Sequence, residues 1–272
     1  MRALQSLRNY VKVLSEVEKK INVFYRLTLW MNTIFYFLFS MKSAKHAKFS
    51  KPVDTVRNLK LNNRSLIRFG DGEFNIISGK GIHYQSFSKD LQLDLTEIIE
   101  GYIDNGKSVR YDLALPADFL KCNGLRLIKK RIYVSSWSYS RWIFKKKYDK
   151  PVVYGDAFLF ARDNEKIYSE LWKGAKTVIF VHNDKKYAEN FSQKYKLDTK
   201  FIQIPSTDAY EKKLKILDQI YGVIEKYGNT DVPILISAGP CGKVLVKELA
   251  NKGYLAYDTG HCWDDPLAPM SK

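Results

Sequence analysis

From about residue 50 to the end of the chain, short apolar runs alternate with longer amphipathic stretches of helical period. Strands that alternate with helices are typical of a mainly parallel sheet covered by helices, so the pattern predicts an α/β fold. On one stretch, apolar residues such as Leu91, Leu95 and Ile98 recur every three or four positions and make one helix face. The predicted strands cover residues 65–69, 108–115, 176–182, 200–204, 233–238 and 254–258.

Two segments complete this pattern. The last predicted helix covers residues 241–252 and ends at Gly253, a common C-terminal cap because glycine adopts positive φ without strain. The segment 131–150 is rich in Trp, Tyr, Arg and Lys and has no regular period. We interpret it as a loop or helical excursion near a ligand site, and we expect specificity to reside there because binding residues concentrate in such segments.

Residues 21–41 form an apolar segment with one internal charge, Arg26, and lysines on both flanks. A membrane-spanning helix needs about 20 predominantly apolar residues, so the segment approaches that length but carries a charge within it. Its aromatics and flanking lysines suit a helix lying on an anionic membrane surface; packing on the domain's own core is the alternative. A signal peptide is disfavoured, since a largely polar stretch precedes the apolar run. We expect an N-terminal arm over residues 1–48 and one folded domain over residues 49–272.

The composition narrows the class of protein. The chain has 272 residues, of which 45% are hydrophobic, enough for a sizeable core and too many for a disordered protein. A formal net charge of +16 favours an anionic partner: nucleic acid, a lipid surface or a phosphorylated small molecule. Cys122, Cys241 and Cys262 form no CxxC pair, so neither a disulfide framework nor a structural zinc site is encoded. A reducing, cytoplasmic location fits best.

The first candidate site follows the first predicted strand, where the chain reads Arg-Phe-Gly-Asp-Gly-Glu over residues 68–73. Ligands of open α/β sheets bind beyond the carboxyl ends of the strands. In extended chain, Asp71 and Glu73 would point to the same side, with the small Gly72 between them. Two convergent carboxylates repel unless a divalent cation lies between them, and Mg²⁺ or Mn²⁺ is the natural occupant. Gly-Asp-Gly is also a turn sequence, which is the alternative for the tripeptide alone.

Two further candidates follow later strands. Residues 237–243 pass from a strand through glycine and proline into a helix, whose free N–H groups near Gly239 could attract an anion. Lys243 could then meet a phosphate, or it could be a solvated helix residue. After the last strand, His261 and three carboxylates lie within residues 258–265. They could supply a base or metal ligands, or be a polar tail with a hydrogen-bonded histidine.

Two smaller signals lie between these sites. Arg162 ends the apolar run YGDAFLFAR and could pair with a diphosphate or be a surface charge. Ser206 lies in the segment Pro-Ser-Thr-Asp-Ala of residues 205–209, where helix capping alone would account for it.

The run RFGDGEF, with ILISAGPCGKVLVKELANKGYLAYDTGH far downstream, resembles the bacterial GT-D-type glycosyltransferase domain family. The similarity covers roughly residues 50–265 and implies a Rossmann-like, mainly parallel sheet with helices on both faces. It also implies a metal-dependent enzyme that moves a sugar from a nucleotide diphosphate sugar to a growing glycan. The family's Asp-x-Glu metal motif falls on Asp71 and Glu73, and Arg162 stands where the family has an arginine.

The chain departs from the family pattern in two places. Asp208 stands where the family segment Pro-Ser-x-Asn-Ala has its asparagine, so an amide contact of that asparagine is not carried over to this chain. After Gly-His the chain reads CWDDPLAPMSK, whereas relatives continue with alternating acidic residues and an aromatic tail. Asp265 stands at about the position of a family glutamate and is the implied base, while His261 matches the family directly.

The resemblance therefore implies a Mn²⁺- or Mg²⁺-dependent hexosyltransferase that uses a UDP-sugar and a glycan or lipid-linked acceptor in bacterial surface polysaccharide or glycoprotein glycan assembly. Membrane contact through residues 21–41 would place it peripherally on the inner face of the plasma membrane. The expected nucleotide-sugar site comprises Arg68, Gly70, Arg162, Ser206, Gly239 and Lys243, with His261 and Asp265 catalytic and Asp71 and Glu73 as metal ligands.

Two other functions are compatible with the charge and the predicted sheet. One is a non-enzymatic nucleic-acid-binding protein, although the sequence has no RRM, KH, helix-turn-helix or zinc-finger signature and no nucleic acid is expected. The other is a different polysaccharide-modifying enzyme, such as a pyruvyl transferase.

Overall fold

The computed structural model describes residues 23, 27–28, 30–129, 134–227 and 232–264. Contacts divide the chain into two compact units. Unit 1 comprises Met1–Ser43 and Cys122–Trp142, and unit 2 comprises Ala44–Lys121 and Ile143–Lys272. This division differs from the expected one after residue 48, since it assigns residues 122–142 to the same unit as the arm.

Unit 1 is helical in the part that the structure describes. Its helices are residues 30–40, α6 (Gly124–Lys129) and α7 (Val134–Ile143, whose last residue belongs to unit 2). The Tyr36 ring lies 4.7 Å from the ring of Tyr139 and 5.0 Å from that of Trp142, measured between centroids. The N-terminal helix (residues 30–40) thus packs on α7 through aromatic rings.

Arg141 fixes the end of the N-terminal helix. Its side chain is 1% exposed. Nη2 donates to the carbonyl oxygen of Ser40 at 2.6 Å, and Nη1 donates to that of Cys122 at 2.9 Å. The last carbonyls of a helix have no partner within the helix, so a cation there satisfies them and interacts favourably with the helix dipole.

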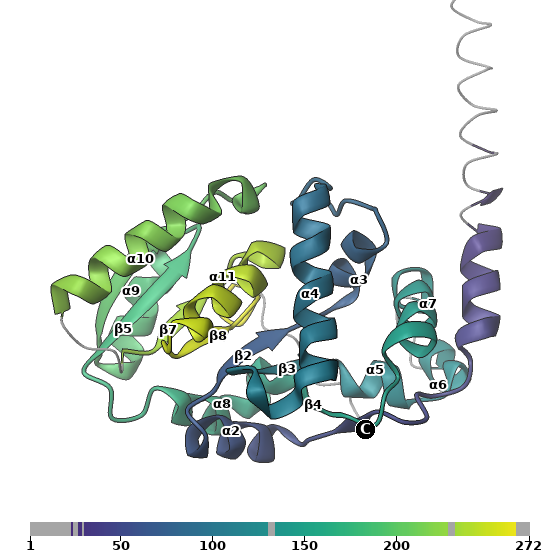
Figure 1. Cartoon of the computed structure of the whole chain (residues 1–272), viewed down its shortest axis with the longest axis horizontal. Coiled ribbons are helices and arrows are strands. Elements are labelled where there is room, and N and C mark those ends of the chain that lie inside the picture. Colours follow the sequence, from purple (N-terminus) through teal and green to yellow (C-terminus); the bar gives the residue numbers. More distant parts are fainter. Residues whose placement is uncertain (1–22, 24–26, 29, 130–133, 228–231, 265–272) are drawn as a thin grey trace, which may run out of the picture. The chain divides into compact units, whose positions relative to one another are not determined.

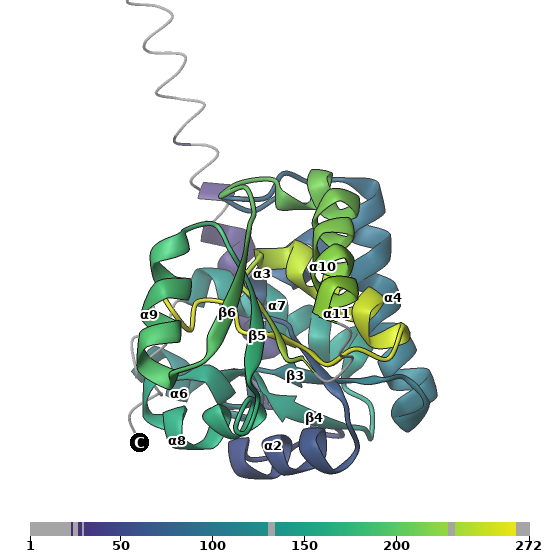
Figure 2. The same cartoon turned by 90° about the vertical axis from the view of Figure 1, so that its left-hand side faces the viewer.

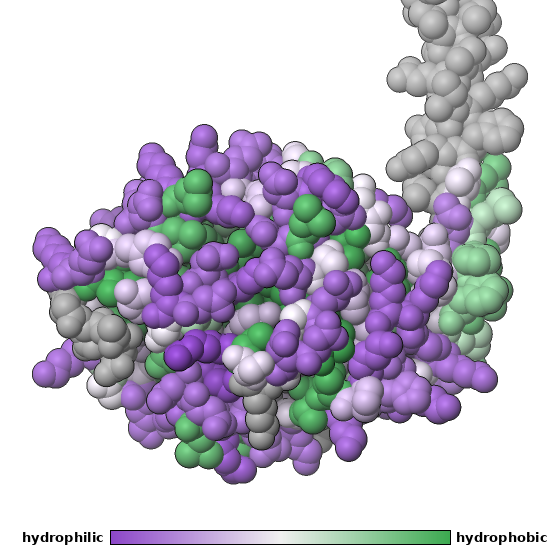
Figure 3. Space-filling view, in the orientation of Figure 1, coloured by the Kyte–Doolittle hydropathy of each residue, from purple (hydrophilic) through white to green (hydrophobic). Residues whose placement is uncertain are grey.

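The rest of the N-terminal helix presents apolar side chains to solvent. Trp30 is 65% exposed, Met31 66% and Phe39 62%. Figure 3 shows this helix as a mainly hydrophobic surface. Packing on a core of its own therefore does not account for this face. Among the described residues, no helix has both the length and the apolar character needed to cross a membrane.

Unit 2 is built on a parallel sheet, which has eight strands in the part of the chain that the structure describes. The spatial order is β1-β4-β3-β2-β8-β7-β5-β6, and each neighbouring pair runs parallel. The strands are β1 (Lys48–Phe49), β2 (Ser65–Arg68), β3 (Tyr111–Leu115), β4 (Val153–Asp156), β5 (Thr177–His182), β6 (Asp198–Gln203), β7 (Ile234–Ile236) and β8 (Ala256–Asp258). The six predicted strands are found; β1 and β4 were not predicted.

Helices cover both faces of this sheet, as Figures 1 and 2 show: α4, α10 and α11 lie on one face and α2, α8 and α9 on the other. The predicted fold class, a mainly parallel sheet between two helical layers, is confirmed. The helices of unit 2 are α2 (Pro52–Leu61), α3 (Asp71–Ile77), α4 (Lys89–Asn105), α5 (Ala117–Lys121), α8 (Glu165–Tyr168), α9 (Lys185–Tyr195), α10 (Lys213–Tyr227) and α11 (Gly239–Asn251), joined by short 3-10 and π turns.

The core follows the two-residue period of the strands. Leu66, Phe180 and Tyr257 share one buried cluster with side chains of α2, α8 and α9. Successive side chains of a strand point to opposite faces, so the alternate residues Ile67 and Ile179, also fully buried, face the layer of α4 and α11. Strands buried on both faces read as the continuous apolar runs from which the sheet was predicted.

Candidate active site

Three strands end close together at the carboxyl edge of the sheet. β2 leads through Gly70 into α3, β7 leads into α11, and β8 leads into the turn of residues 259–264. Because β2 and β8 are neighbours, the backbone N–H of Arg68 donates to the Asp258 carboxylate at 3.2 Å, across 190 residues of sequence. Residues from near the beginning and near the end of the domain's sequence therefore lie close together at this edge.

A buried lysine lies between two carboxylates at this edge. Lys243 Nζ is 3.0 Å from Asp258 Oδ2 and 3.3 Å from Glu73 Oε1, and the exposed fractions of the three side chains are 7% or less. Burial alone would lower the pKa of the Lys243 ammonium, but the charges of Asp258 and Glu73 outweigh burial and hold its pKa above the usual value. Lys243 is therefore a charged, buried residue and not the solvated helix residue that was one alternative.

The Asp-x-Glu motif lies in the first turn of α3 and not in extended chain. Gly70 caps the helix, and its N–H donates to Glu73 Oε2 at 2.6 Å. Two residues that are two positions apart on a helix do not share a face, so the expected side-by-side arrangement of Asp71 and Glu73 does not follow. Sequence pattern suggested an extension of β2, whereas the Gly70 cap ends the strand and starts the helix.

Arg68 and Gly260 pack closely beside this cluster. Arg68 Nη1 donates to the carbonyl oxygen of Ala157 at 3.1 Å, and the guanidinium lies 5.4 Å from the centroid of the Phe160 ring. Gly260 has a φ of +51°, and a Cβ there would lie 2.1 Å from Arg68 Nη2. A side chain at this position would be strained by the positive φ and would displace the guanidinium, so glycine suits the Gly-His step after β8.

A loop between α3 and α4, which we call the strap (residues 79–88), is held by Asp208. The Asp208 carboxylate accepts from the N–H of Ser86 at 2.6 Å and from Gln85 Nε2 at 3.3 Å, and its own N–H donates to the carbonyl oxygen of Tyr84 at 3.0 Å. Asp208 has a φ of +49°, a left-handed conformation that Asn and Asp adopt more readily than most residues. In both contacts the Asp208 side chain accepts through an oxygen, and an asparagine side chain also has an oxygen that accepts hydrogen bonds.

The strap places Tyr84 at the edge of the cluster. A Cβ at Gly239, where φ is +53°, would lie 2.8 Å from the Tyr84 ring, and the ring meets His261 edge-on at 6.4 Å. Burial and then the charge of Glu73 raise the pKa of Tyr84 to about 12, so it stays a neutral phenol. Tyr84 could not be predicted from the sequence, because Asp208, Gly239 and His261, which it contacts, lie more than 100 residues away.

The structure places His261 at the surface of the site. The residue is exposed, and Nδ1 lies 3.3 Å from Asp264 Oδ2. The hydrogen bond with Asp264 raises the pKa of His261 above its usual value. The predicted base, Asp265, lies outside the described residues.

The remaining predicted residues are less closely joined to the cluster. Arg162 is exposed in a 3-10 turn, and no contact among the described residues links it to Lys243. Ser206 is exposed on the loop that also carries Asp208. Of the segment 131–150, expected near the ligand site, residues 131–133 lie outside the described residues. Its other residues form α7 and the π turn that follows it, and residues 144–150 lie just before β4, at the amino edge of the sheet.

Asp156 is a second missed residue, at the carboxyl end of β4. Burial raises its pKa to about 6, against the opposing effect of the N–H of Phe158, which donates to Oδ1 at 2.9 Å. The same hydrogen bond caps the following 3-10 turn, so the residue also has a local structural role.

The expected metal ligands fit a divalent ion only in part. Both oxygens of Glu73 already have cationic or N–H partners, Lys243 and Gly70. No group of three or more His, Cys, Asp and Glu suited to a metal occurs within the described ranges. Asp71 is half-buried at the first position of α3.

Comparison with known proteins identifies a matching family and two similar proteins. The family model "Glycosyltransferase GT-D fold" matches residues 66–265. The chain is 26% identical to a "Probable glycosyl transferase Gly" of Streptococcus gordonii over 72% of this chain and 29% of that protein. It is 27% identical to the "Glycosyltransferase GlyD" of Streptococcus pneumoniae over 74% of this chain and 25% of that protein. The chain thus spans less than a third of the length of these two relatives.

Solved structures show the same fold. "A New Glycosyltransferase (DUF1792) from Streptococcus sanguinis" superposes with a TM-score of 0.63 at 26% identity, covering 80% of this chain and 82% of that one. A second structure, described as a "highly conserved domain of unknown function 1792" with "a distinct glycosyltransferase fold", superposes with a TM-score of 0.63 at 24% identity over 84% of this chain and 81% of that one. The predicted Rossmann-like sheet of this family is confirmed.

Proposed function

Since this chain belongs to the glycosyltransferase GT-D fold family, we propose that it transfers a hexose from a UDP-sugar to a glycan or lipid-linked acceptor. The observation that carries the proposal is the cluster of Glu73, Lys243 and Asp258 at the carboxyl edge of the sheet, inside the matched region. Open α/β sheets bind their ligands at this edge. Buried charges that are fully paired there hold the surrounding backbone in place for a ligand.

The donor diphosphate is proposed to bind where α11 begins. Helix N-termini attract anions, because several N–H groups there have no partner within the helix and the helix dipole is positive at this end. Gly239 lies at this start, beside the Tyr84 ring. The guanidinium of Arg68 provides a cation at the same edge, and Tyr84 offers an aromatic face for the base or the sugar of the donor.

The charge balance of the cluster supports a divalent ion. Lys243 and Arg68 carry two positive charges, and Glu73 and Asp258 carry two negative ones, so the four leave no excess for a diphosphate. We propose that Asp71, with the donor phosphates, holds Mn²⁺ or Mg²⁺, while Glu73 positions the start of α3. Such an ion, when bound, neutralises negative charge on the leaving diphosphate.

Proton removal from the acceptor is proposed to fall to Asp265, with His261 nearby in sequence. A carboxylate or histidine within hydrogen-bond reach of the acceptor hydroxyl would accept its proton as the oxygen attacks. The bond between the sugar's anomeric carbon and the diphosphate then breaks, and UDP leaves with its electron pair. The acceptor is proposed to be part of a surface glycan assembled at the inner face of the plasma membrane, with residues 21–41 in contact with that surface.

Release of UDP tests this function directly. Wild-type protein is incubated with Mn²⁺, a crude glycan acceptor and, in turn, UDP-glucose, UDP-galactose and their N-acetyl forms. We expect UDP from at least one donor, and a loss of at least about 100-fold in rate for Asp71→Asn, because removal of a group that stabilises transition-state charge costs about that much. The matched control is Asp104→Asn, which changes an exposed aspartate near the C-terminal end of α4.

Two results would contradict the proposal. One is the absence of UDP release from every donor while pyruvate or another group is transferred. The other is salt-dependent RNA binding that Asp71→Asn leaves unchanged, without any sugar transfer.

A further inference from the structure

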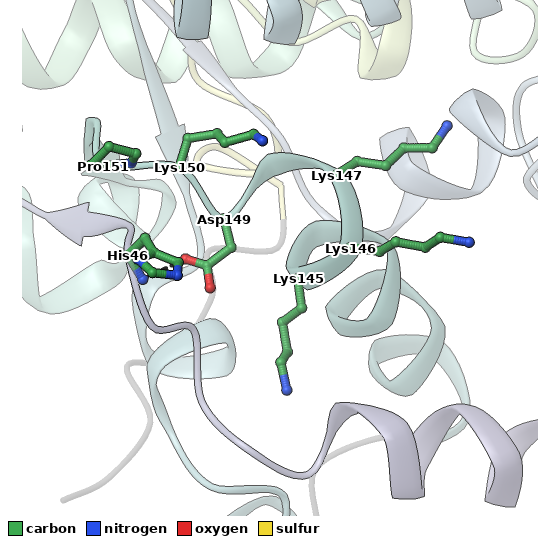
Figure 4. A pocket seen from close by; sticks show the side chains of 7 residues that line it. All are labelled: His46, Lys145, Lys146, Lys147, Asp149, Lys150 and Pro151. Carbon is green, nitrogen blue, oxygen red and sulfur yellow. Dashed lines mark hydrogen bonds between the residues drawn. The ribbon is translucent and has the colours of Figure 1, made fainter.

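A basic cavity lies at the amino edge of the sheet in unit 2, and the function proposed above does not use it. Its volume is about 400 Å³, and Figure 4 shows the residues that line it, among them His46, Lys145, Lys146, Lys147, Asp149 and Lys150. These residues precede β1 and β4, whereas the candidate active site follows the carboxyl ends of the strands. The cavity is therefore separate from the donor site.

The local fold presents the three consecutive lysines outward. Residues Phe144–Tyr148 form a π turn whose two end residues are buried, with Phe144 0% exposed and Tyr148 2%. The lysines between them are left on the outer side of the turn, where Lys146 and Lys147 are exposed and Lys145 is half-buried. Two aromatic anchors thus hold the lysine-bearing turn against unit 2.

The one carboxylate in the cavity is engaged by the backbone. Asp149 accepts from the N–H groups of Lys45 at 2.7 Å, His46 at 2.9 Å and Ala47 at 2.8 Å. These bonds fix the chain before β1 as the wall of the cavity. Four lysines and one carboxylate line the cavity, so it attracts anions.

The arrangement of the lysines favours a surface of many phosphates over a single small anion. In Figure 4, the ammonium groups of Lys145, Lys146 and Lys147 fan out from the turn and do not converge on one point. A small phosphorylated ligand is usually held by convergent groups. Diverging cations on a fixed turn suit the headgroups of a lipid surface, which attract basic clusters within about a Debye length.

The chain also carries, in unit 1, an N-terminal helix whose exposed side chains favour a membrane over another polyanion as a partner of this protein. Its exposed Trp30, Met31 and Phe39 have no use in binding a nucleic acid backbone but are typical of helices that insert into a lipid interface. We propose that the lysine cluster, Lys145, Lys146, Lys147 and Lys150, binds the phosphate headgroups of an anionic membrane surface. This membrane site goes beyond the transfer reaction, and vesicle binding requires no catalysis, so the two can fail separately.

Sedimentation with lipid vesicles tests the proposal on the full-length protein. Vesicles of phosphatidylglycerol and phosphatidylcholine are compared with vesicles of phosphatidylcholine alone. The variant Lys146→Gln/Lys147→Gln/Lys150→Gln is matched with Lys212→Gln/Lys215→Gln/Lys226→Gln, which removes three exposed lysines on and just before α10. A basic residue near an anionic surface contributes about fivefold to binding, so we expect a loss on the order of 100-fold for the first triple variant only. Both variants are expected to unfold at the wild-type temperature and to release UDP at the wild-type rate.

Four results would overturn the proposal. Equal binding by the cluster variant and the wild type would show that the cluster does not contact lipid. Equal losses in both triple variants would show a bulk charge effect. Release from vesicles by millimolar inorganic phosphate at constant ionic strength would identify a free phosphate site. RNA binding that the cluster variant alone loses, without vesicle binding by the wild type, would identify a nucleic-acid surface.

Discussion

At the scale of single residues, Lys243 is the residue on which the candidate site depends. Its ammonium faces two buried carboxylates that start from different elements, Glu73 on α3 and Asp258 at the end of β8. A buried ion pair adds little stability relative to apolar residues of similar size, but removal of one partner leaves an uncompensated charge. The pairing therefore serves to fix the positions of α3, α11 and β8 at the site.

We predict that Lys243→Met lowers the free energy of unfolding by about 3–5 kcal/mol at neutral pH, because Glu73 and Asp258 lose their counter-charge. The unpaired carboxylates would then have raised pKa values, so the variant should approach the wild type as the pH falls and they become protonated. Urea unfolding at pH 7 and pH 4 measures both effects. Lys247→Met, on the same helix, is the control, since its partner Glu97 is 67% exposed and such pairs contribute about 1 kcal/mol or less. A loss no larger than the control's would contradict the role of Lys243.

Asp156 gives a second prediction, from its pKa of about 6 against 3.8 in the unfolded chain. Between these values the folded state binds more protons than the unfolded state, so this residue makes stability fall as the pH rises from 4 to 6 and adds no further change above that. Asp156→Asn removes the effect and keeps an oxygen for the N–H of Phe158. As the pH rises from 4 to 6, the free energy of unfolding of the variant should increase by on the order of 2–3 kcal/mol relative to that of the wild type, as measured by urea unfolding. A difference that is constant with pH would contradict the raised pKa.

Several of these residues could be predicted from the sequence, and others could not. Asp71, Glu73 and Lys243 follow strands and stand next to glycines, and this pattern indicates candidate site residues. Their partners are set by tertiary contacts: Lys243 meets Glu73 across 170 positions, and Tyr84 reaches the site on a strap that Asp208 holds. The extended conformation expected for Asp71 and Glu73 was wrong, because Gly70 caps a helix there.

At the scale of elements, long apolar runs predicted the strands well. The two missed strands have different causes. β1 has only two residues, Lys48 and Phe49, and no periodicity can be read from so short a segment. β4 reads Val-Tyr-Gly-Asp, in which glycine and aspartate are typical of turns, and its pairing with β3 overrides that preference.

The strap is an element that the Asp208 side chain contacts at two groups, the N–H of Ser86 and Nε2 of Gln85. We predict that Asp208→Ala releases it: amide exchange over residues 82–88 should become about tenfold faster, since loss of a hydrogen bond to a charged acceptor costs about 1.5–3 kcal/mol. Asp208→Asn keeps an acceptor oxygen but loses its charge, so its exchange should be slower than that of the alanine variant and closer to that of the wild type. Hydrogen–deuterium exchange by mass spectrometry distinguishes the two. Unchanged exchange in the alanine variant would show that the strap is held by other contacts.

At the scale of the whole chain, the division into two units shows that the N-terminal arm shares a unit with a later segment. Residues 1–43 share a unit with residues 122–142, so the arm is not an appendage that can be removed cleanly. Sequence pattern could not show this, because the contacts join segments about 100 residues apart through Tyr36 and Arg141.

Deletion of residues 1–43 should therefore uncover α7. Without the Ser40 carbonyl and the Tyr36 ring, Arg141 and Tyr139 lose partners, so the free energy of local unfolding of α7 should fall by at least about 1.4 kcal/mol. Trypsin should therefore cleave after Arg141 on the order of tenfold faster or more. Cleavage after Lys185 or Lys186 in α9 of unit 2 is the internal control. Equal rates after Arg141 in both proteins would show that α7 is held without the arm.

The central claim is that a UDP-sugar binds at the carboxyl edge around Asp71, Lys243 and Tyr84. Calorimetric titration of UDP into the full chain, with and without Mn²⁺, tests it most directly. We predict binding that Mn²⁺ strengthens in the wild type and in Asp104→Asn, and a loss of at least about tenfold, or 1.4 kcal/mol, in Asp71→Asn. Binding of UDP with equal affinity by Asp71→Asn and the wild type, or no binding of UDP under either condition, would contradict the account.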